Sequence, residues 1–221
     1  MSWSDLSDWW LTEIADDPTY ETVVTPLLLD ILNPVAGASY VDLGSGEGRL
    51  MGEVLSTGAV VLGVELSESL AKMTPARAVV AELPQIPLRT DSFAGAFAVL
   101  VLEHLQDHAC FFSETARVVR SEGVLALVIN HPIWTAPDST PITDTDGELL
   151  WRPGEYFSTG KTEIPAGNGT VTFHHRTMAS LLNSAAEAGW SLQHMIERPH
   201  HELEDQAGVP RLLACRWRLL L

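Results

Sequence analysis

The residues whose types and spacing most clearly suggest a ligand site are an acid, Asp42, and three glycines that follow it within residues 41–50. Asp42 ends an apolar run, and Gly44, Gly46 and Gly48 follow it before a segment that can form a helix. Without Cβ atoms, such a turn lets the backbone pass close to a ligand and adopt positive φ. The helix that follows directs free N–H groups and its positive dipole end at the same place. A carboxylate beside these amides suits a ligand that carries both charges, such as an amino acid.

A glycine-rich turn after a strand has more than one interpretation. The dinucleotide-binding fingerprint Gly-x-Gly-x-x-Gly needs a glycine where this chain has Arg49, so a nicotinamide oxidoreductase is an alternative that lacks its third glycine. The sequence Asp-Leu-Gly-Ser-Gly-Glu-Gly resembles instead the first motif of the class I S-adenosylmethionine-dependent methyltransferases. This resemblance implies that the methionine end of the cofactor is held by Asp42, Gly44, Ser45, Gly46 and Gly48.

Acids also stand where the next strands are expected to end, which is where ligands lie in an open α/β sheet. Glu65 comes about 20 residues after the glycine turn, where an acid can accept hydrogen bonds from ribose hydroxyls, and Leu66 can pack on the adenine. Residues 81–88, Ala-Glu-Leu-Pro-Gln-Ile-Pro-Leu, resemble the family's Asp-Ala-x-x-Leu-Pro-Phe segment. The resemblance implies that Glu82, in place of the family's Asp, reaches the adenine amino group and that Leu83 belongs to the cofactor site.

Residues 92–105 resemble a third family segment, Ser-Phe-Asp followed by an apolar strand and Glu-His-Leu. Ala94 replaces the Asp, whose usual role is to tether the strand locally. Leu100 is predicted to contact the cofactor through its backbone and side chain. His104 either borders the cofactor or substrate or packs as a helix cap. The family also suggests an N-terminal tyrosine that closes over the cofactor, here Tyr20, with ordinary helix packing as the alternative.

Three histidines are candidates for a general base or a substrate contact, with structural hydrogen bonding as the alternative. His131 follows the fifth expected strand, and His174 and His175 belong to a His-His-Arg-Thr segment that resembles one in bacterial small-molecule methyltransferases. Neighbours in an extended segment point to opposite faces, and no Cys or acid lies at ligand spacing, so no metal site is predicted. Four aromatic residues either line an acceptor site or pack on one another: Trp134, Trp151, Tyr156 and Phe157.

These residues need a scaffold, and the order of apolar runs and periodic segments indicates one. Strands are expected at 39–43, 59–65, 78–81, 92–102, 123–130, 190–196 and 211–219, and helices at 6–15, 20–32, 67–73, 107–120 and 177–188. This alternation predicts an α/β fold: a Rossmann-like, doubly wound, mostly parallel seven-stranded sheet with helices on both faces. The resemblance implies that the last strand is antiparallel.

Two segments lie outside that alternation. Residues 131–172 carry no long periodic element, and a segment of about 40 residues without regular structure is usually a lid or binding loop. Residues 1–34 are expected to form a helical cap ahead of the first strand. The whole chain, 1–221, is therefore predicted to be a single domain with a cap and with a lid inserted after strand five.

Composition limits the partners. The chain has 221 residues, with 13 Lys and Arg against 29 Asp and Glu and a net charge of -16. Such a surface repels phosphate backbones, so a small molecule is expected rather than nucleic acid. Cys110 and Cys215 lack metal or redox spacing, the start lacks a signal-peptide pattern, and no apolar run approaches a membrane span. A cytoplasmic protein is therefore predicted, and its oligomeric state is left open.

The resemblance implies an enzyme that binds S-adenosylmethionine and transfers a methyl group to a small-molecule acceptor by in-line displacement. Alignment of the acceptor alone can remove roughly 7–11 kcal/mol of barrier, whereas a general base typically adds about 10²–10⁴-fold. A weakly indicated catalytic histidine is therefore compatible with this function. A catalytically silent S-adenosylmethionine-binding module that acts through a partner is the alternative.

Overall fold

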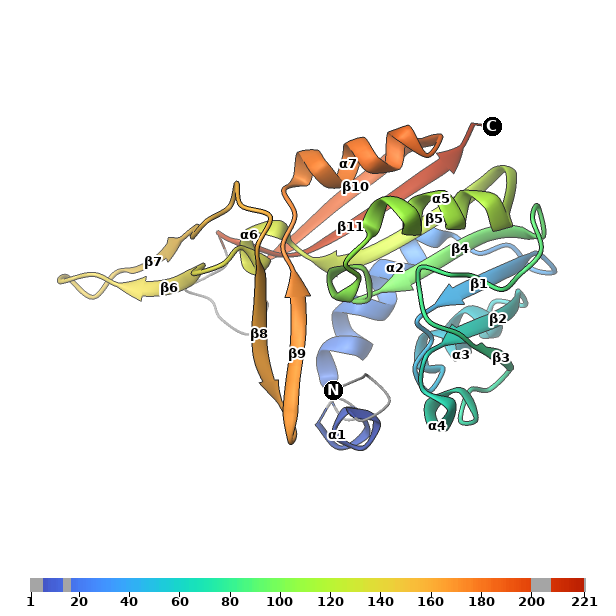
Figure 1. Cartoon of the computed structure of the whole chain (residues 1–221), viewed down its shortest axis with the longest axis horizontal. Helices are drawn as coiled ribbons and strands as arrows, with labels where there is room; N and C mark the ends of the chain where they lie inside the picture. Colours follow the sequence, from blue (N-terminus) through green and yellow to red (C-terminus); the bar gives the residue numbers. More distant parts are fainter. Residues whose placement is uncertain (1–5, 14–16, 200–207, 221) are drawn as a thin grey trace.

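The computed structural model describes residues 6–13, 17–199 and 208–220, and a seven-stranded sheet in the order β10-β11-β5-β4-β1-β2-β3 forms its centre (Figure 1). The strands are β1 (Ser39–Leu43), β2 (Val60–Glu65), β3 (Arg77–Val80), β4 (Phe93–Val99), β5 (Val119–Asn130), β10 (Trp190–Pro199) and β11 (Pro210–Leu219). β11 is antiparallel to both of its neighbours, and the other pairs are parallel. The predicted doubly wound, mostly parallel sheet is confirmed, as is the direction of the last strand.

Helices cover both faces of the sheet because the central strands are apolar on both sides. The helical segments are α1 (Ser7–Glu13), the π-helix Tyr20–Val24, α2 (Thr25–Leu32), α3 (Arg49–Ser56), α4 (Glu68–Ala71), the 3₁₀-helix η3 (Leu102–His104), α5 (His108–Val118), α6 (Pro132–Thr135) and α7 (Met178–Glu187). No helix in the described part of the chain is long and apolar enough to span a membrane.

The two faces have separate cores. On β5, Leu125 and Leu127 pack in the core beneath α5 and α7, and Val128 packs in the core beneath α2 and α3. This alternation follows from the period of two in a strand. The sequence expects the helix before β5 to reach residue 120, but the strand already begins at Val119. Glu122 then takes a left-handed φ of 64° where the register against β4 shifts.

Several helices begin with a side-chain cap. The side chains of Ser67, Asp107 and Thr177 each accept a hydrogen bond from the N–H three residues later. The helix expected at 20–32 is present, but its first five residues form a π-helix, and α2 begins at Thr25. The helix expected at 6–15 ends at Glu13, and residues 14–16 lie outside the described residues.

The expectation that residues 131–172 lack regular structure is wrong. After α6, the chain forms a hairpin of β6 (Thr140–Thr143) and β7 (Leu149–Arg152), and then a hairpin of β8 (Lys161–Ala166) and β9 (Gly169–His174). Glycines with positive φ, at 83° in Gly147 and 54° in Gly167, lie in the two turns. Asp-Gly and Gly-Asn-Gly are hairpin-turn sequences, so a local signal for both hairpins was present.

The second of these hairpins lies against the N-terminal helix. Figure 1 shows β8–β9 standing across the end of the sheet with α1 at its tip, while β6–β7 projects away from the sheet. Leu6 and Trp9 pack with Ala166, Val171 and Phe173 in a small apolar cluster that is separate from the two cores. The N-terminal helix and the β8–β9 hairpin therefore form one layer beside the carboxyl ends of the strands.

Candidate functional site

A cavity of about 500 Å³ lies at the carboxyl ends of β1, β2 and β4, beneath this layer. Its volume falls within the range of about 300–1,000 Å³ that is usual for small-molecule sites. It brings together these predicted cofactor residues from segments far apart in the chain: Tyr20, Asp42, Gly44, Ser45, Gly46, Glu65, Leu66, Glu82, Leu83, Leu100 and His104. Gly48 does not line it.

The glycines of the turn have different surroundings. Gly46 has φ of 55°, and a Cβ there would enter the cavity with Trp10 Nε1 as its nearest neighbour, at 3.8 Å. Gly48, at φ of 88°, precedes α3, and its Cβ would lie only 2.4 Å from Pro75 Cδ. Gly46 therefore leaves open space for a ligand, whereas Gly48 allows the turn to pack on the residues before β3. This difference explains why Gly48 is absent from the cavity wall.

Two carboxyl groups lie at the bottom of the cavity, and they differ in their hydrogen bonding. Glu65 is fixed, because Oε2 accepts a hydrogen bond from Gly46 N and Oε1 accepts one from Ser67 N, both at 2.8 Å. Asp42 is 3 % exposed, and its Oδ2 has no hydrogen-bond partner among the described residues. Burial raises the pKa of Asp42 well above its ordinary value, and the nearby charges of Glu65 and Glu47 raise it further.

This arrangement fits the methionine end of an adenosyl amino acid. A buried carboxylate with an orphaned oxygen is costly unless a cation or donor reaches it, and an ammonium group supplies both. The buried Ser45 Oγ is also without a partner among the described residues. The N–H groups of Gly44 and Gly46 already donate to Val64 O and Glu65 Oε2, so the carboxylate of the same ligand needs another donor.

The wall formed by the N-terminal segment contains a contact that the sequence did not predict. Trp10 Nε1 of α1 donates to Glu47 Oε2 at 2.7 Å, and Arg49 Nε donates to Glu47 Oε1 at 3.0 Å. The Arg49 guanidinium lies 4.7 Å from the centre of the buried Tyr20 ring. The N-terminal segment is thus tied directly to the glycine turn. Its richness in tryptophan was the available signal, but nothing in the sequence indicates which tryptophan meets Glu47.

The far side of the cavity is formed by the exits of β3 and β4. Glu82 is exposed, and together with Leu83 it lines this side. Leu100 takes a left-handed φ of 56°, and its N–H donates to Val128 O at 2.7 Å. Such a backbone costs a non-glycine residue roughly 1–2 kcal/mol, and strain of this kind clusters at functional sites. The sharp turn places Leu100 in the cavity wall.

Two of the three candidate histidines belong to the scaffold instead of the cavity. His131 caps α6 by accepting a hydrogen bond from Ile133 N at 3.1 Å, and its Nε2 lies 2.8 Å from Glu197 Oε1. His175 is 2 % exposed, with Nδ1 3.1 Å from Thr135 Oγ1 and Nε2 2.7 Å from the carbonyl oxygen of Tyr156. Neither ring lines the 500 Å³ cavity. The expectation that either could act there as a base is corrected on this geometry.

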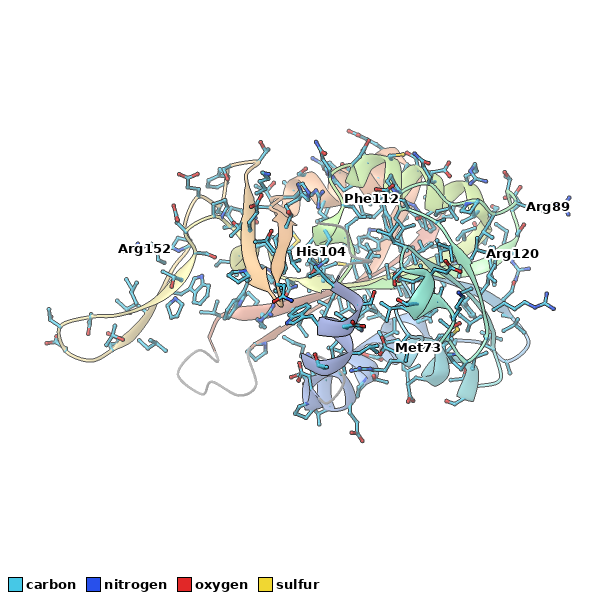
Figure 2. All side chains as sticks on the ribbon, turned by 60° about the horizontal axis from the view of Figure 1, so that its bottom comes forward. Met73, Arg89, His104, Phe112, Arg120 and Arg152 are labelled. Atoms are coloured by element: carbon cyan, nitrogen blue, oxygen red, sulfur yellow. The ribbon has the colours of Figure 1, made fainter. Side chains whose placement is uncertain are left out.

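His174, by contrast, lines the cavity together with His104. Burial lowers the pKa of His174, and the positive charge of Arg176 lowers it further, so its imidazole is neutral at pH 7. The ring of His104 lies 4.6 Å from that of Phe173, and its Nδ1 is 2.9 Å from Thr172 O. Figure 2 shows His104 beside the β8–β9 hairpin. No group of three or more His, Cys, Asp or Glu within the described residues could hold a metal ion.

Arg176 explains how the loop around His104 is held. Its guanidinium donates to the carbonyl oxygens of Leu102, at 2.8 Å, Leu105, and Gln106, at 3.2 Å. Burial lowers the pKa of Arg176 to about 10, so the group stays charged at neutral pH. The His-His-Arg-Thr segment therefore clamps the Glu-His-Leu segment, 70 residues earlier in the chain, into the cavity wall.

None of the four aromatic residues predicted to contact an acceptor lines the 500 Å³ cavity. Trp134 and Trp151 pair with ring centres 4.3 Å apart, and Tyr156 packs on His175 with ring centres 5.7 Å apart. Phe157 is 90 % exposed. Trp134 of α6 and Trp151 of β7 therefore pack on one another, which is the alternative that the sequence left open, and no acceptor contact by these rings is made in the large cavity. Trp134 lines a second, smaller cavity of about 210 Å³.

The strand order, the single antiparallel strand and the cavity over the glycine turn define a Rossmann-like protein with its ligand site at the strand ends. Residues 41–127 match the methyltransferase domain family. The crystal structure of an S-adenosylmethionine-dependent methyltransferase from Mesorhizobium loti is similar, with a TM-score of 0.78 and 27 % identity over 87 % of this chain and 96 % of that chain. Residues 41–127 thus carry a methyltransferase domain, on a fold shared with S-adenosylmethionine-dependent methyltransferases, and this similarity supports S-adenosylmethionine as the cofactor.

Sequence relatives point to the same family. A ubiquinone biosynthesis O-methyltransferase from Albidiferax ferrireducens is 30 % identical over 54 % of this chain and 53 % of its own length. An O-methyltransferase from Pyrenophora dematioidea is 27 % identical over 49 % of this chain and 46 % of its own length. The matched part of this chain thus spans about half the length of these relatives.

Proposed function

We propose that this chain transfers the methyl group of S-adenosylmethionine to a small-molecule acceptor. The observation that carries the proposal is the buried Asp42 carboxylate, with an oxygen that lacks a partner among the described residues, beside a glycine turn that opens into a cavity of about 500 Å³. The electrostatics favour a ligand with an ammonium group at this point, and the family supplies one in its cofactor. When bound, the cofactor provides an electrophilic methyl group on a sulfonium.

In this proposal, each wall of the cavity has a separate task. Asp42 binds the ammonium group, and Gly46, which carries no side chain, leaves the ligand room to approach the turn. Glu65 keeps lone pairs for the ribose hydroxyls, because each of its oxygens accepts one backbone hydrogen bond and can accept another. Glu82 lies at the end where the adenine amino group would be.

The adenine and the sulfonium region also need apolar contacts and a cover. Leu66, Leu83 and Leu100 supply apolar wall on the adenine side. Tyr20, held under Arg49, covers the opposite side together with Trp10. This cover excludes water from the region in which the acceptor must approach the methyl group in line.

Alignment of the acceptor supplies most of the proposed rate enhancement, and His174 takes the proton where the acceptor is a hydroxyl. The names of the sequence relatives favour an oxygen acceptor. Because the pKa of His174 is lowered, turnover should rise with pH through a value below 6.5 and be level near neutrality. His174→Gln should lower kcat about 10²-fold with the cofactor Kd unchanged, and an unaltered kcat would remove this role.

Acidic composition and the two free thiols, Cys110 and Cys215, support a small-molecule acceptor rather than nucleic acid and a reducing, cytoplasmic location. The test of the function begins with calorimetry of S-adenosylmethionine and S-adenosylhomocysteine on the folded protein. Transfer of labelled methyl groups to a panel of hydroxylated small molecules then follows. Absence of binding would refute the proposal, and binding with no transfer to any acceptor would favour the silent module.

A further inference from the structure

The second cavity, of about 210 Å³, lies next to the first and has a different chemical character. His104 lines the large cavity and Phe173 lines the small one, and their ring centres are 4.6 Å apart. The two cavities therefore come close to one another at this pair of rings. The aromatic faces of Trp134 and Phe173 and the side chain of Ile164 make part of the small cavity apolar.

Arg211, at the start of β11, is the one cationic side chain among the residues that line this small cavity. The central carbon of its guanidinium lies over the Trp134 ring, 4.9 Å from the ring centre, which is within the range of a cation–π contact. Within the described ranges its one hydrogen bond runs from Nη1 to Asn130 Oδ1, and no described carboxylate forms an ion pair with it. An arginine has five N–H donors, and the remaining ones suit a planar carboxylate.

Asn130 connects this arginine to a buried acid beneath it. Asn130 Nδ2 donates to Glu103 Oε1 at 2.5 Å, and Asn130 N donates to the same oxygen at 3.1 Å. With both ends of the amide engaged, the Asn130 side chain is held in one orientation and positions Arg211. Burial lowers the pKa of Arg211, and the negative charge of Glu103 partly opposes this shift. Asp138 also lines the small cavity, but it is exposed, so solvent screens its charge.

We infer that the small cavity binds the carboxylate of a planar, acidic acceptor, with Arg211 as its counter-ion and Trp134 and Phe173 as its apolar walls. This inference rests on the proposed function and names the class of acceptor for the same site. The acidic end of the acceptor is anchored at Arg211, and the rest of the molecule extends past the His104–Phe173 pair toward the large cavity. A neutral acceptor of the same shape offers the Arg211 guanidinium no charge to pair with, so it should bind more weakly.

Benzoate and its neutral isostere benzamide are suitable probes, because they share ring and size and differ in charge. Calorimetry on the full chain with saturating S-adenosylhomocysteine should show benzoate binding at least tenfold more tightly than benzamide. Arg211→Gln should weaken benzoate binding at least tenfold and leave benzamide binding unchanged. Arg218→Gln is the matched control, since Arg218 lies on the same strand, exposed and paired with Glu122 at the other end.

Equal affinity for the two probes would overturn the inference, as would benzoate binding that is unaffected by Arg211→Gln. The absence of benzoate binding, in protein that does bind S-adenosylhomocysteine, would also overturn it. Arg211→Lys keeps the charge and should retain a preference for benzoate, which tests the inference even where the Gln variant does not fold. The affinity for S-adenosylhomocysteine should be the same in all three variants. Wild-type protein that fails to bind S-adenosylhomocysteine contradicts the proposed function instead.

Discussion

Asp42→Asn is expected to change stability and cofactor affinity in opposite directions. In the folded protein the Asp42 carboxyl group is removed from water, faces Glu65 and Glu47, and has an oxygen without a partner in the described part of the chain. Its negative charge therefore opposes folding of the free protein. The same charge is what an ammonium group requires, so its removal should weaken cofactor binding.

The magnitudes follow from these two roles. A hydrogen bond to a charged group is worth about 1.5–3 kcal/mol, so the Kd for S-adenosylmethionine should rise by about 10- to 150-fold. The raised pKa means that the folded protein binds this proton more tightly than the unfolded chain. Stability therefore falls as the pH rises from about 4, the ordinary value for Asp, to the pKa in the folded state, by about 1.4 kcal/mol per pH unit. The Asp42→Asn variant lacks this dependence, because its amide does not titrate.

Urea unfolding of both proteins between pH 4 and pH 8, without cofactor, measures the stability difference, and calorimetry at pH 7.5 measures the affinity. The free energy of unfolding of the variant, relative to that of the wild type, should increase as the pH rises. Asp30→Asn is the matched control, because Asp30 is exposed on α2 and carries the same chemical change. Parallel stability profiles, or an unchanged Kd for the cofactor, would refute the reasoning about Asp42.

Three further perturbations test other parts of the site. Gly46→Ala should cost about 1–2 kcal/mol of stability, because the backbone is left-handed there, and should weaken cofactor binding at least tenfold. Gly48→Ala places a Cβ 2.4 Å from a proline ring atom, so it should cost about 1–3 kcal/mol more stability but leave the cofactor affinity of the folded protein unchanged. Thermal unfolding measures stability and calorimetry measures affinity, and the reverse pattern would contradict this assignment. Trp10→Phe removes the donor that lies 2.7 Å from Glu47. The cofactor dissociation rate should then rise about tenfold in stopped-flow fluorescence. An unchanged rate would show that this contact does not retain the cofactor. Burial lowers the pKa of His175, so the unfolded chain binds the proton more tightly and wild-type stability falls as the pH falls through about 6.5. His175→Gln should flatten that fall in urea unfolding at pH 5.5 and 7.5, and equal slopes would exclude this histidine as its source.

Local pattern was sufficient for the scaffold and for most of the cofactor cavity. Apolar runs such as Val60–Glu65 identify buried strands, and their alternation with helical segments predicts a mostly parallel sheet with helices on both faces. Because the carboxyl ends of parallel strands meet at one edge, residues that end their strands, such as Asp42 and Glu65, are brought together by the topology alone. That is why the strand-end residues singled out from the sequence line one cavity.

The partners of the histidines and aromatic residues were decided only by the tertiary structure. Periodicity states which face of an element is apolar, but it carries no information on which distant side chain completes a hydrogen bond. His131 meets Glu197, 66 residues later, and Asn130 meets Arg211, 81 residues later. Short polar contacts of this kind depend on positions within a fraction of an ångström in the folded chain, whereas burial and strand direction depend on averages over many residues. Local pattern therefore specifies the strands, the glycine turn and the acids at the strand ends, whereas only packing in three dimensions determines which histidine and which arginine line a cavity.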